Sequence, residues 1–202
     1  MIIFFAVAMT VAFWAPNDKP YTMSDGSTQN PATLTDLIAS CKGVVDWQTA
    51  PSAYVGWLPE GATHRYPIFP PTSGTFSALA AKPGIYDLGS KTAPAIPQAM
   101  GSLWRGAVVI WYKPDLDVKK KESLFQFAKA EPGGGKFIVA PWPNNKSNNW
   151  SSSDAIVLTA WGMSQACDVA SYDVMDAFAK RIASRPAPGN NVPYTTPGPK
   201  LG

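Results

Sequence analysis

The sequence has few side chains that bind metals or act as catalytic bases. Its 202 residues include one histidine, His64, and two cysteines, Cys41 and Cys167. A metal site built from histidine and cysteine usually needs about four such ligands, so the supply is too small for one. A histidine-dependent nucleophile triad is also disfavoured, because only His64 could serve as the base. We therefore expect no catalytic residues, no metal and no other cofactor.

Charged residues are also scarce: they make up 15% of the chain, and the formal net charge is +3. The lysines are scattered, apart from a run at residues 119–121, whereas a nucleic-acid surface needs a dense basic patch. We therefore expect no nucleic-acid partner. We interpret the lysine run as the solvated face of a helix, with an anionic partner or a lipid surface as the alternative.

By contrast, 46% of the residues are hydrophobic, and residues 2–15 are almost wholly apolar. As a helix, this segment would span about 21 Å, less than the roughly 30 Å hydrocarbon core of a bilayer. We favour an uncleaved membrane anchor at residues 1–16 over a signal peptide or a buried soluble helix. The aromatic residues expected to contact the membrane or a partner protein are Phe4, Phe5, Phe13 and Trp14.

The prolines and glycines, 20 and 16 in number, divide the rest of the chain. Residues 17–30 are polar and rich in turn-forming residues, which predicts a linker. Residues 31–184 are long enough for one sizeable core, so we expect a single domain there. Residues 185–202 are rich in proline and glycine and cannot build a core of their own. We expect this segment to be an extended arm that becomes ordered only on a neighbouring molecule.

A short element of the domain is expected to form a stiff turn. Proline fixes φ, hydroxyl side chains bond to the neighbouring backbone, and glycine permits a positive φ. The residues of this turn are Pro70, Pro71, Thr72, Ser73 and Gly74.

Three apolar runs predict buried strands, at residues 106–112, 136–140 and 155–161. A turn that carries Trp104 and Arg105 is expected to lead into the first of these strands. Shorter strands or extended loops are expected at residues 44–48, 52–57 and 65–68. A Pro-Gly turn at residues 83–87 is expected to lead into a further short strand.

Helices are expected between and after these strands. Asp117 can cap a helix that continues to about Ala130, and Ser171 begins a second helix with apolar residues on one side. Asn30 is the expected N-cap of a shorter helix. The pattern predicts an α+β fold: a small, loop-rich, mixed β-sheet with two or three packed helices, preceded by the hydrophobic anchor helix.

Paired carboxylates are the remaining route to catalysis. The candidate pairs are Asp115 with Asp117 and Asp173 with Asp176. Each pair lies at a predicted helix start, where a carboxylate caps the helix or complements its dipole. We therefore interpret them as helix-start residues.

The two cysteines leave two alternatives open. Cys41 and Cys167 can form a disulfide, which an oxidising compartment would permit. They can equally be two buried free thiols, because two cysteines set no spacing framework.

Several short elements carry a resemblance to a known family. They are Pro70-Pro-Thr-Ser-Gly74, Gly84-Ile-Tyr86, Leu103, Gly106-Ala-Val-Val-Ile-Trp-Tyr112, Leu158-Thr-Ala-Trp-Gly162 and Cys167-Asp168. Through them, residues 64–185 resemble the bacterial domain of unknown function 3105 family. Members of this family often follow an N-terminal membrane segment, which implies an extracytoplasmic domain here.

The same resemblance shows what this chain lacks. Family members read Pro-Pro-Thr-Ser-Gly-Pro-His and, later, His-Asn-Leu-Glu-His-Gly, which looks like a metal or acid–base site. Here the first histidine corresponds to Phe76, and the second motif has Gly101, Trp104 and Arg105 in place of the two histidines and the glutamate. Indole, phenyl and guanidinium groups do not ligate a cation. The resemblance therefore implies a divergent member with a degenerate site.

These observations lead us to expect a non-catalytic accessory or structural subunit of a larger membrane protein complex, such as a photosynthetic or respiratory one. It would dock through the N-terminal anchor and an aromatic-rich domain on the periplasmic or extracellular side. One alternative is an enzyme or metal-handling protein with an unrecognised site around His64, Tyr66 and Arg105. Another is a secreted cell-surface or filament protein.

Overall fold

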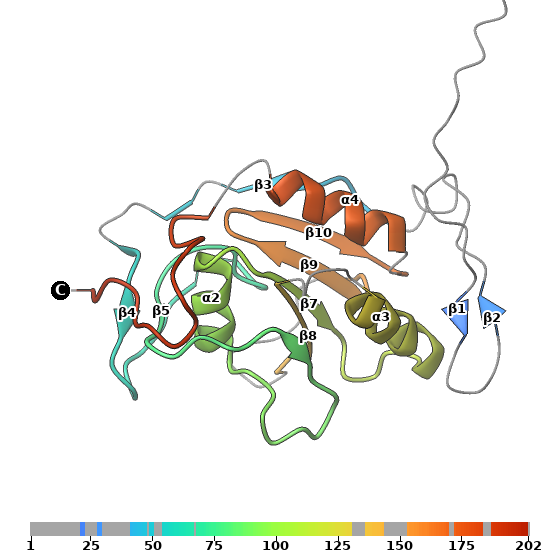
Figure 1. Ribbon diagram of the computed structural model, residues 1–202, viewed down its shortest axis with the longest axis horizontal. Coiled ribbons are helices and arrows are strands. Elements are labelled where there is room, and N and C mark those ends of the chain that lie inside the picture. Colours follow the sequence, from blue (N-terminus) through green and yellow to red (C-terminus); the bar gives the residue numbers. More distant parts are fainter. Residues whose placement is uncertain are drawn as a thin grey trace, which may run out of the picture.

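The computed structural model describes residues 21–22, 28–29, 41–47, 49–50, 54–66, 68–130, 136–143, 153–169, 172–183 and 187–201. A six-stranded mixed sheet lies at the centre of the domain (Figure 1). In spatial order its strands are β3 (Val45–Asp46), β10 (Met163–Cys167), β9 (Ile156–Ala160), β7 (Val108–Tyr112), β8 (Phe137–Pro141) and β6 (Gly84–Ile85). Strands β7, β8 and β6 are parallel, and the other neighbouring strands are antiparallel.

Two smaller sheets accompany the central one. Strands β1 (Tyr21–Thr22) and β2 (Thr28–Gln29) pair antiparallel. Strands β4 (Trp57–Leu58) and β5 (Phe76–Ser77) pair parallel, so two segments separated in sequence lie side by side near the C-terminal residues (Figure 1).

Three helices occur among the described residues: α2 (Ile96–Trp104), α3 (Val118–Ala130) and α4 (Tyr172–Ala183). Helix α2 connects β6 to β7, and α3 connects β7 back to β8, which lies between those two strands. Crossovers between parallel strands are right-handed, so connections that run in opposite directions place their helices on opposite faces of the sheet. The core contacts agree, because α2 packs on one face and α3 and α4 pack on the other.

We call the face under α3 and α4 the helix-covered face. Alternate residues of a strand point to the same face, and here Val108, Ile110 and Val139 point towards these two helices. The apolar helix residues that meet them are Leu124, Phe127, Met175, Phe178 and Ile182. This cluster is the larger part of the core.

We call the opposite face the tail-covered face. Val109, Trp111 and Ile138 point to it and pack with α2 and with Phe76. Residues 187–201 return over α2, with the backbone N–H of Gly189 donating to the Trp104 carbonyl at 2.9 Å. Figure 1 shows this C-terminal segment, in red, passing beside α2 towards β4.

The α+β fold with a mixed sheet and three packed helices is confirmed. The three long predicted strands are β7, β8 and β9, and the helices expected to begin at Asp117 and Ser171 are α3 and α4. Asp117 caps α3, because its Oδ1 accepts from the backbone N–H groups of Lys119 and Lys120 at 2.9 and 3.3 Å.

Two expectations need correction. Trp104 is the last residue of α2 and not part of a turn. The C-terminal segment was expected to be ordered only on a neighbouring molecule, whereas residues 187–201 bond to their own domain, because its backbone groups find partners there.

The anchor at residues 1–16, with Phe4, Phe5, Phe13 and Trp14, lies outside the described residues, as do most of the linker and of the helix expected after Asn30. Within the described ranges, no helix combines the length and the apolar composition that crossing a membrane requires.

Candidate functional site

Helix α2 places the residues at the degenerate family motif. It begins after Ala95, whose backbone N–H donates to Gln98 Oε1 at 3.0 Å, and Pro97 lies in its first turn, where a proline is tolerated. It ends at Trp104 with Arg105 as the C-cap, and the next residue, Gly106, has a φ of +83°. The N–H of Gly106 bonds to the Leu103 carbonyl, and that of Ala107 to the Ser102 carbonyl, both at 2.9 Å. This is a Schellman motif, and it delivers Trp104 and Arg105 at the end of the helix.

The motif positions form one buried cluster, which we call the Trp104 cluster: Phe76, Gly101, Trp104 and Arg105. The rings of Phe76 and Trp104 stack with their centroids 5.4 Å apart and an interplanar angle of 26°. The Arg105 guanidinium carbon lies 5.3 Å from the centroid of the Trp104 ring, a cation–π arrangement. These positions therefore lie together, on β5 and at the end of α2.

Arg105 is a fully buried cation whose hydrogen-bond partners are carbonyl groups. Its Nη1 donates to Gly101 O at 2.7 Å, its Nε to Pro193 O at 3.2 Å, and its Nη2 to Thr196 O. Of the ion pairs found among the described residues, none involves Arg105. Burial lowers the pKa of Arg105, but a guanidinium remains protonated in proteins. Its donors are thus directed to the backbone of α2 and of the C-terminal segment.

The C-terminal segment, residues 187–201, covers the Trp104 cluster. A Cβ added at Gly189 would lie 2.2 Å from Trp104 Cζ3, so only glycine fits there. A Cβ at Gly198 would lie 3.0 Å from Phe76 Cε2 and 3.1 Å from Trp104 Cζ3. Both glycines therefore lie directly on the aromatic rings. Lys136 adds a further link, since its Nζ donates to Arg105 O at 3.2 Å and to Asn190 O at 2.8 Å.

Tyr194 is the ionisable group beside Arg105 in this segment. Its hydroxyl is buried and has no hydrogen-bond partner in the described part of the chain. Burial raises the pKa of Tyr194 to about 12, although the nearby Arg105 charge acts in the opposite direction. At neutral pH it is a neutral phenol. The cluster and its cover thus offer no group that exchanges a proton near pH 7.

The Pro-Pro-Thr-Ser-Gly element is a buried turn, as expected for a structural role. All five residues, Pro70, Pro71, Thr72, Ser73 and Gly74, are buried. The turn is tied to distant segments: Thr72 O accepts from Gly162 N–H, and Ser73 Oγ accepts from Ala50 N–H, both at 2.9 Å. Gly74 has a φ of +127°, a conformation that favours glycine.

His64 and Tyr66 contact Thr75, the residue that follows this turn. His64 Nδ1 is 3.1 Å from Thr75 Oγ1, and the Tyr66 hydroxyl donates to Thr75 O at 3.1 Å. Burial lowers the pKa of His64 and raises that of Tyr66. Both side chains are thus bonded to Thr75, whereas Arg105 is bonded to α2 and the C-terminal segment. The three residues considered for an alternative site therefore have different partners.

Metal ligands do not gather in the described residues. No group of three or more His, Cys, Asp or Glu side chains there could hold a metal ion. Of the four carboxylates considered earlier, three have local roles: Asp117 caps α3, Asp173 lies in the first turn of α4, and Asp176 pairs with Lys180 at 2.6 Å.

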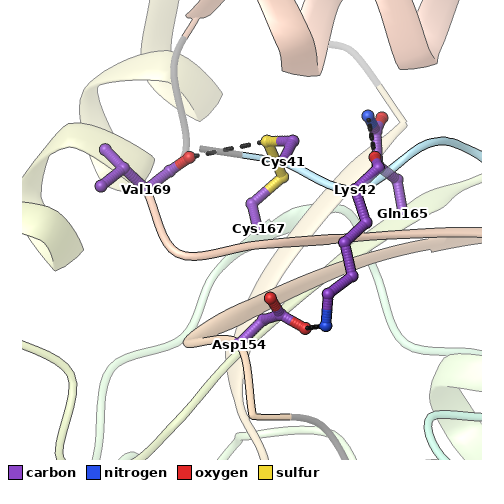
Figure 2. The surroundings of a disulfide bond; sticks show 6 residues. All are labelled: Cys41, Lys42, Asp154, Gln165, Cys167 and Val169. Atoms are coloured by element: carbon purple, nitrogen blue, oxygen red, sulfur yellow. Dashed lines mark hydrogen bonds and ion pairs between the residues drawn. A yellow bond between two sulfur atoms is a disulfide. The ribbon is translucent and has the colours of Figure 1, made fainter. Parts of the chain in front are cut away.

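Cys41 and Cys167 form a disulfide across 126 positions of sequence. Figure 2 shows its surroundings; Cys167 is the last residue of β10. Lys42 follows Cys41 and is held on both sides, since its carbonyl accepts from Gln165 Nε2 at 3.0 Å and its Nζ lies 2.6 Å from Asp154 Oδ2. Cys41 Sγ lies 3.7 Å from the Val169 carbonyl, but a disulfide sulfur has no hydrogen to donate. The disulfide therefore fastens the start of the domain to the sheet.

Comparison with known families gives one match. The model of the family described as "Protein of unknown function (DUF3105)" matches residues 59–195. The chain belongs to this family. No curated protein and no solved structure matches it. The matched range contains the buried turn, the Trp104 cluster and most of the segment that covers this cluster.

Sequence reasoning missed the cover of this DUF3105 domain. Gly189, Tyr194 and Gly198 belong to a Pro/Gly-rich segment without periodicity, which gives no signal of what it packs against. Helix α2 was also not predicted, although Gly106 suits a C′ position. Pro97 and Gly101 have low helix propensity, which weakens the helical signal of residues 96–104.

Proposed function

We propose that this chain is a non-catalytic accessory or structural subunit of a larger protein complex at a membrane. One observation carries the proposal: the family-motif positions hold the buried Trp104 cluster, and the chain's own C-terminal segment covers it. Phenyl, indole and guanidinium groups neither ligate a metal ion nor act as a base near pH 7. A domain that retains the family's turn and strands but fills the motif positions in this way is suited to binding and support.

The membrane location rests on the apolar residues 2–15, and on Phe4, Phe5, Phe13 and Trp14 as contacts with lipid or a partner protein. The Cys41–Cys167 disulfide supports an oxidising compartment, because disulfides persist outside the cytosol. We therefore place the domain on the periplasmic or extracellular side.

Size-exclusion chromatography of native membranes tests this proposal. Membranes that contain the full-length, epitope-tagged chain are solubilised in a mild detergent and separated. We expect the chain to elute with other proteins in a fixed ratio, at a mass far above its own 21.6 kDa. Deletion of residues 2–15 is the matched variant, and it should move the chain out of the membrane fraction. Elution of the intact chain alone in its detergent micelle would contradict the proposal.

A further inference from the structure

A cleft of about 850 Å³ opens beside the buried Pro-Pro-Thr-Ser-Gly turn, and no residue of the Trp104 cluster is among its described lining residues. Its floor is formed by the turn residues Thr72, Ser73 and Gly74. Trp47, Tyr54, Leu58, Ile68 and Leu201 contribute the apolar part of its walls. The volume lies in the range of about 300–1,000 Å³ that is usual for small-molecule sites.

Hydrogen bonds between distant segments fix the shape of this cleft. Ala50 is held to Ser73 Oγ at 2.9 Å, which joins one wall to the floor. Leu201 is held by its backbone N–H, which donates to Trp57 O at 3.1 Å, next to the wall residue Leu58. A site with such preformed walls requires little ordering when a ligand binds.

One cation and several hydroxyl groups supply the polar surface of the cleft. Arg65 lines it, is exposed, and has no carboxylate partner within the described ranges. Thr49, Thr63 and Thr75 add hydroxyl groups, and none of the described residues that line the cleft is acidic. An apolar cleft with one unpaired guanidinium is complementary to a ligand that is apolar along its body and anionic at one end.

We propose that this cleft binds a small free carboxylate with an aromatic or other apolar body. The body lies between Trp47, Tyr54 and Leu58, and the carboxylate pairs with Arg65. Two exposed aromatic side chains at the mouth favour a planar body, because rings gain from stacked or edge contacts. The proposal concerns binding only and is independent of the assembly role proposed above.

Isothermal titration calorimetry with the purified full-length protein tests this site. The probe is 2-naphthoate, and 2-naphthamide is its uncharged analogue of nearly the same shape. We expect 2-naphthoate to bind saturably at one site, about tenfold more tightly than the amide, because a charge-assisted hydrogen bond to Arg65 adds to the same apolar contacts. Failure of 2-naphthoate to saturate, or equal affinity for the two probes, would overturn the proposal.

Two variants locate the binding. Arg65→Gln should reduce the affinity for 2-naphthoate to that for 2-naphthamide and leave the amide unaffected. Thr63→Trp, at an exposed position on the wall, should weaken both probes by filling the cleft. Lys91→Gln removes the same charge from an exposed loop before α2 and should change neither affinity. If Arg65→Gln and Lys91→Gln have equal effects, the binding is non-specific and the proposal is wrong. Thermal unfolding of each variant verifies that it is folded.

Discussion

The two faces of the central sheet are covered in different ways. On the helix-covered face, mainly aliphatic strand residues such as Ile110 and Val139 meet two amphipathic helices. On the tail-covered face, Trp111, Phe76 and Trp104 meet one helix and an irregular segment that returns from far along the chain. The first face depends on hydrophobic burial by regular elements. The second depends on close backbone approach and on a buried cation, so we expect the two faces to respond differently to substitution.

The largest effect is expected from the disulfide, which belongs to the helix-covered face through Cys167. Replacing both cysteines by alanine should lower the free energy of unfolding by about 4–5 kcal/mol, since the closed loop is long. Urea unfolding of the oxidised protein and of the variant measures this difference. Cys41→Ala alone leaves the buried Cys167 in place and should cost almost as much. A decrease in the free energy of unfolding of less than about 1 kcal/mol in both variants would show that the disulfide contributes little to the stability of the helix-covered face.

The second effect concerns the tail-covered face alone. Arg105→Met removes the donors to Gly101 O, Pro193 O and Thr196 O and should lower the free energy of unfolding by about 2–4 kcal/mol. Hydrogen exchange should increase in α2 and residues 187–201 before it increases in α3 and α4. Arg181→Met is the control, because Arg181 is exposed and its ion pair with Asp46 should contribute less than about 1 kcal/mol. An equal increase in hydrogen exchange on both faces would show that Arg105 does not stabilise the tail-covered face selectively.

A third variant tests the close approach of the tail. Gly189→Ala introduces a Cβ into the Trp104 ring and should cost about 1–3 kcal/mol, as overpacking does. Limited proteolysis should then cut residues 187–201 more rapidly. Gly43→Ala is the matched control, because nothing lies within 4 Å of a Cβ at that position. A tail that is cut at the same rate in both variants would mean that it does not rest on Trp104.

The smallest effect depends on pH and belongs to the helix-covered face. A hydrogen bond from Lys121, at 3.0 Å, is the main cause that lowers the pKa of Asp87 below its usual value of 3.8. A depressed folded-state pKa adds stability above the unfolded-state pKa, and this is lost as the pH falls through the folded-state value. Because Asp87 is 55% exposed, we expect less than about 1 kcal/mol. The difference in unfolding free energy between wild type and Asp87→Asn should be present at pH 7 and disappear below about pH 3. If the difference in unfolding free energy persists at this low pH, it is caused by packing and not by the charge of Asp87.

The helix-covered face could be predicted from the sequence, for physical reasons that are local. The strand β7 is a continuous apolar run, Asp117 is a recognisable N-cap, and Met175, Phe178 and Ile182 recur at helical spacing. Each of these signals lies within a few residues of the element that it predicts.

The tail-covered face could be predicted only in part. The grouping of Phe76, Trp104 and Arg105 followed from the family resemblance, and the structure brings them together. Helix α2 was not predicted. It contains Gly101, a residue with low helix propensity, and a Cβ at this position would lie 3.3 Å from Ser77 O, so close packing explains the glycine. The partners of Arg105 are backbone carbonyls, which every residue carries, so no side-chain pattern identifies them in advance.

The position of the covering segment in the chain has a consequence during synthesis. Pro193, which accepts a hydrogen bond from Arg105, is made 88 residues later than this arginine. Domains fold as the chain emerges from the ribosome, so the side chains of Phe76, Trp104 and Arg105 stay exposed to water until residues 187–201 have been synthesised. A premature stop codon before Ala187 would therefore yield a product with exposed aromatic side chains that aggregates or binds to chaperones.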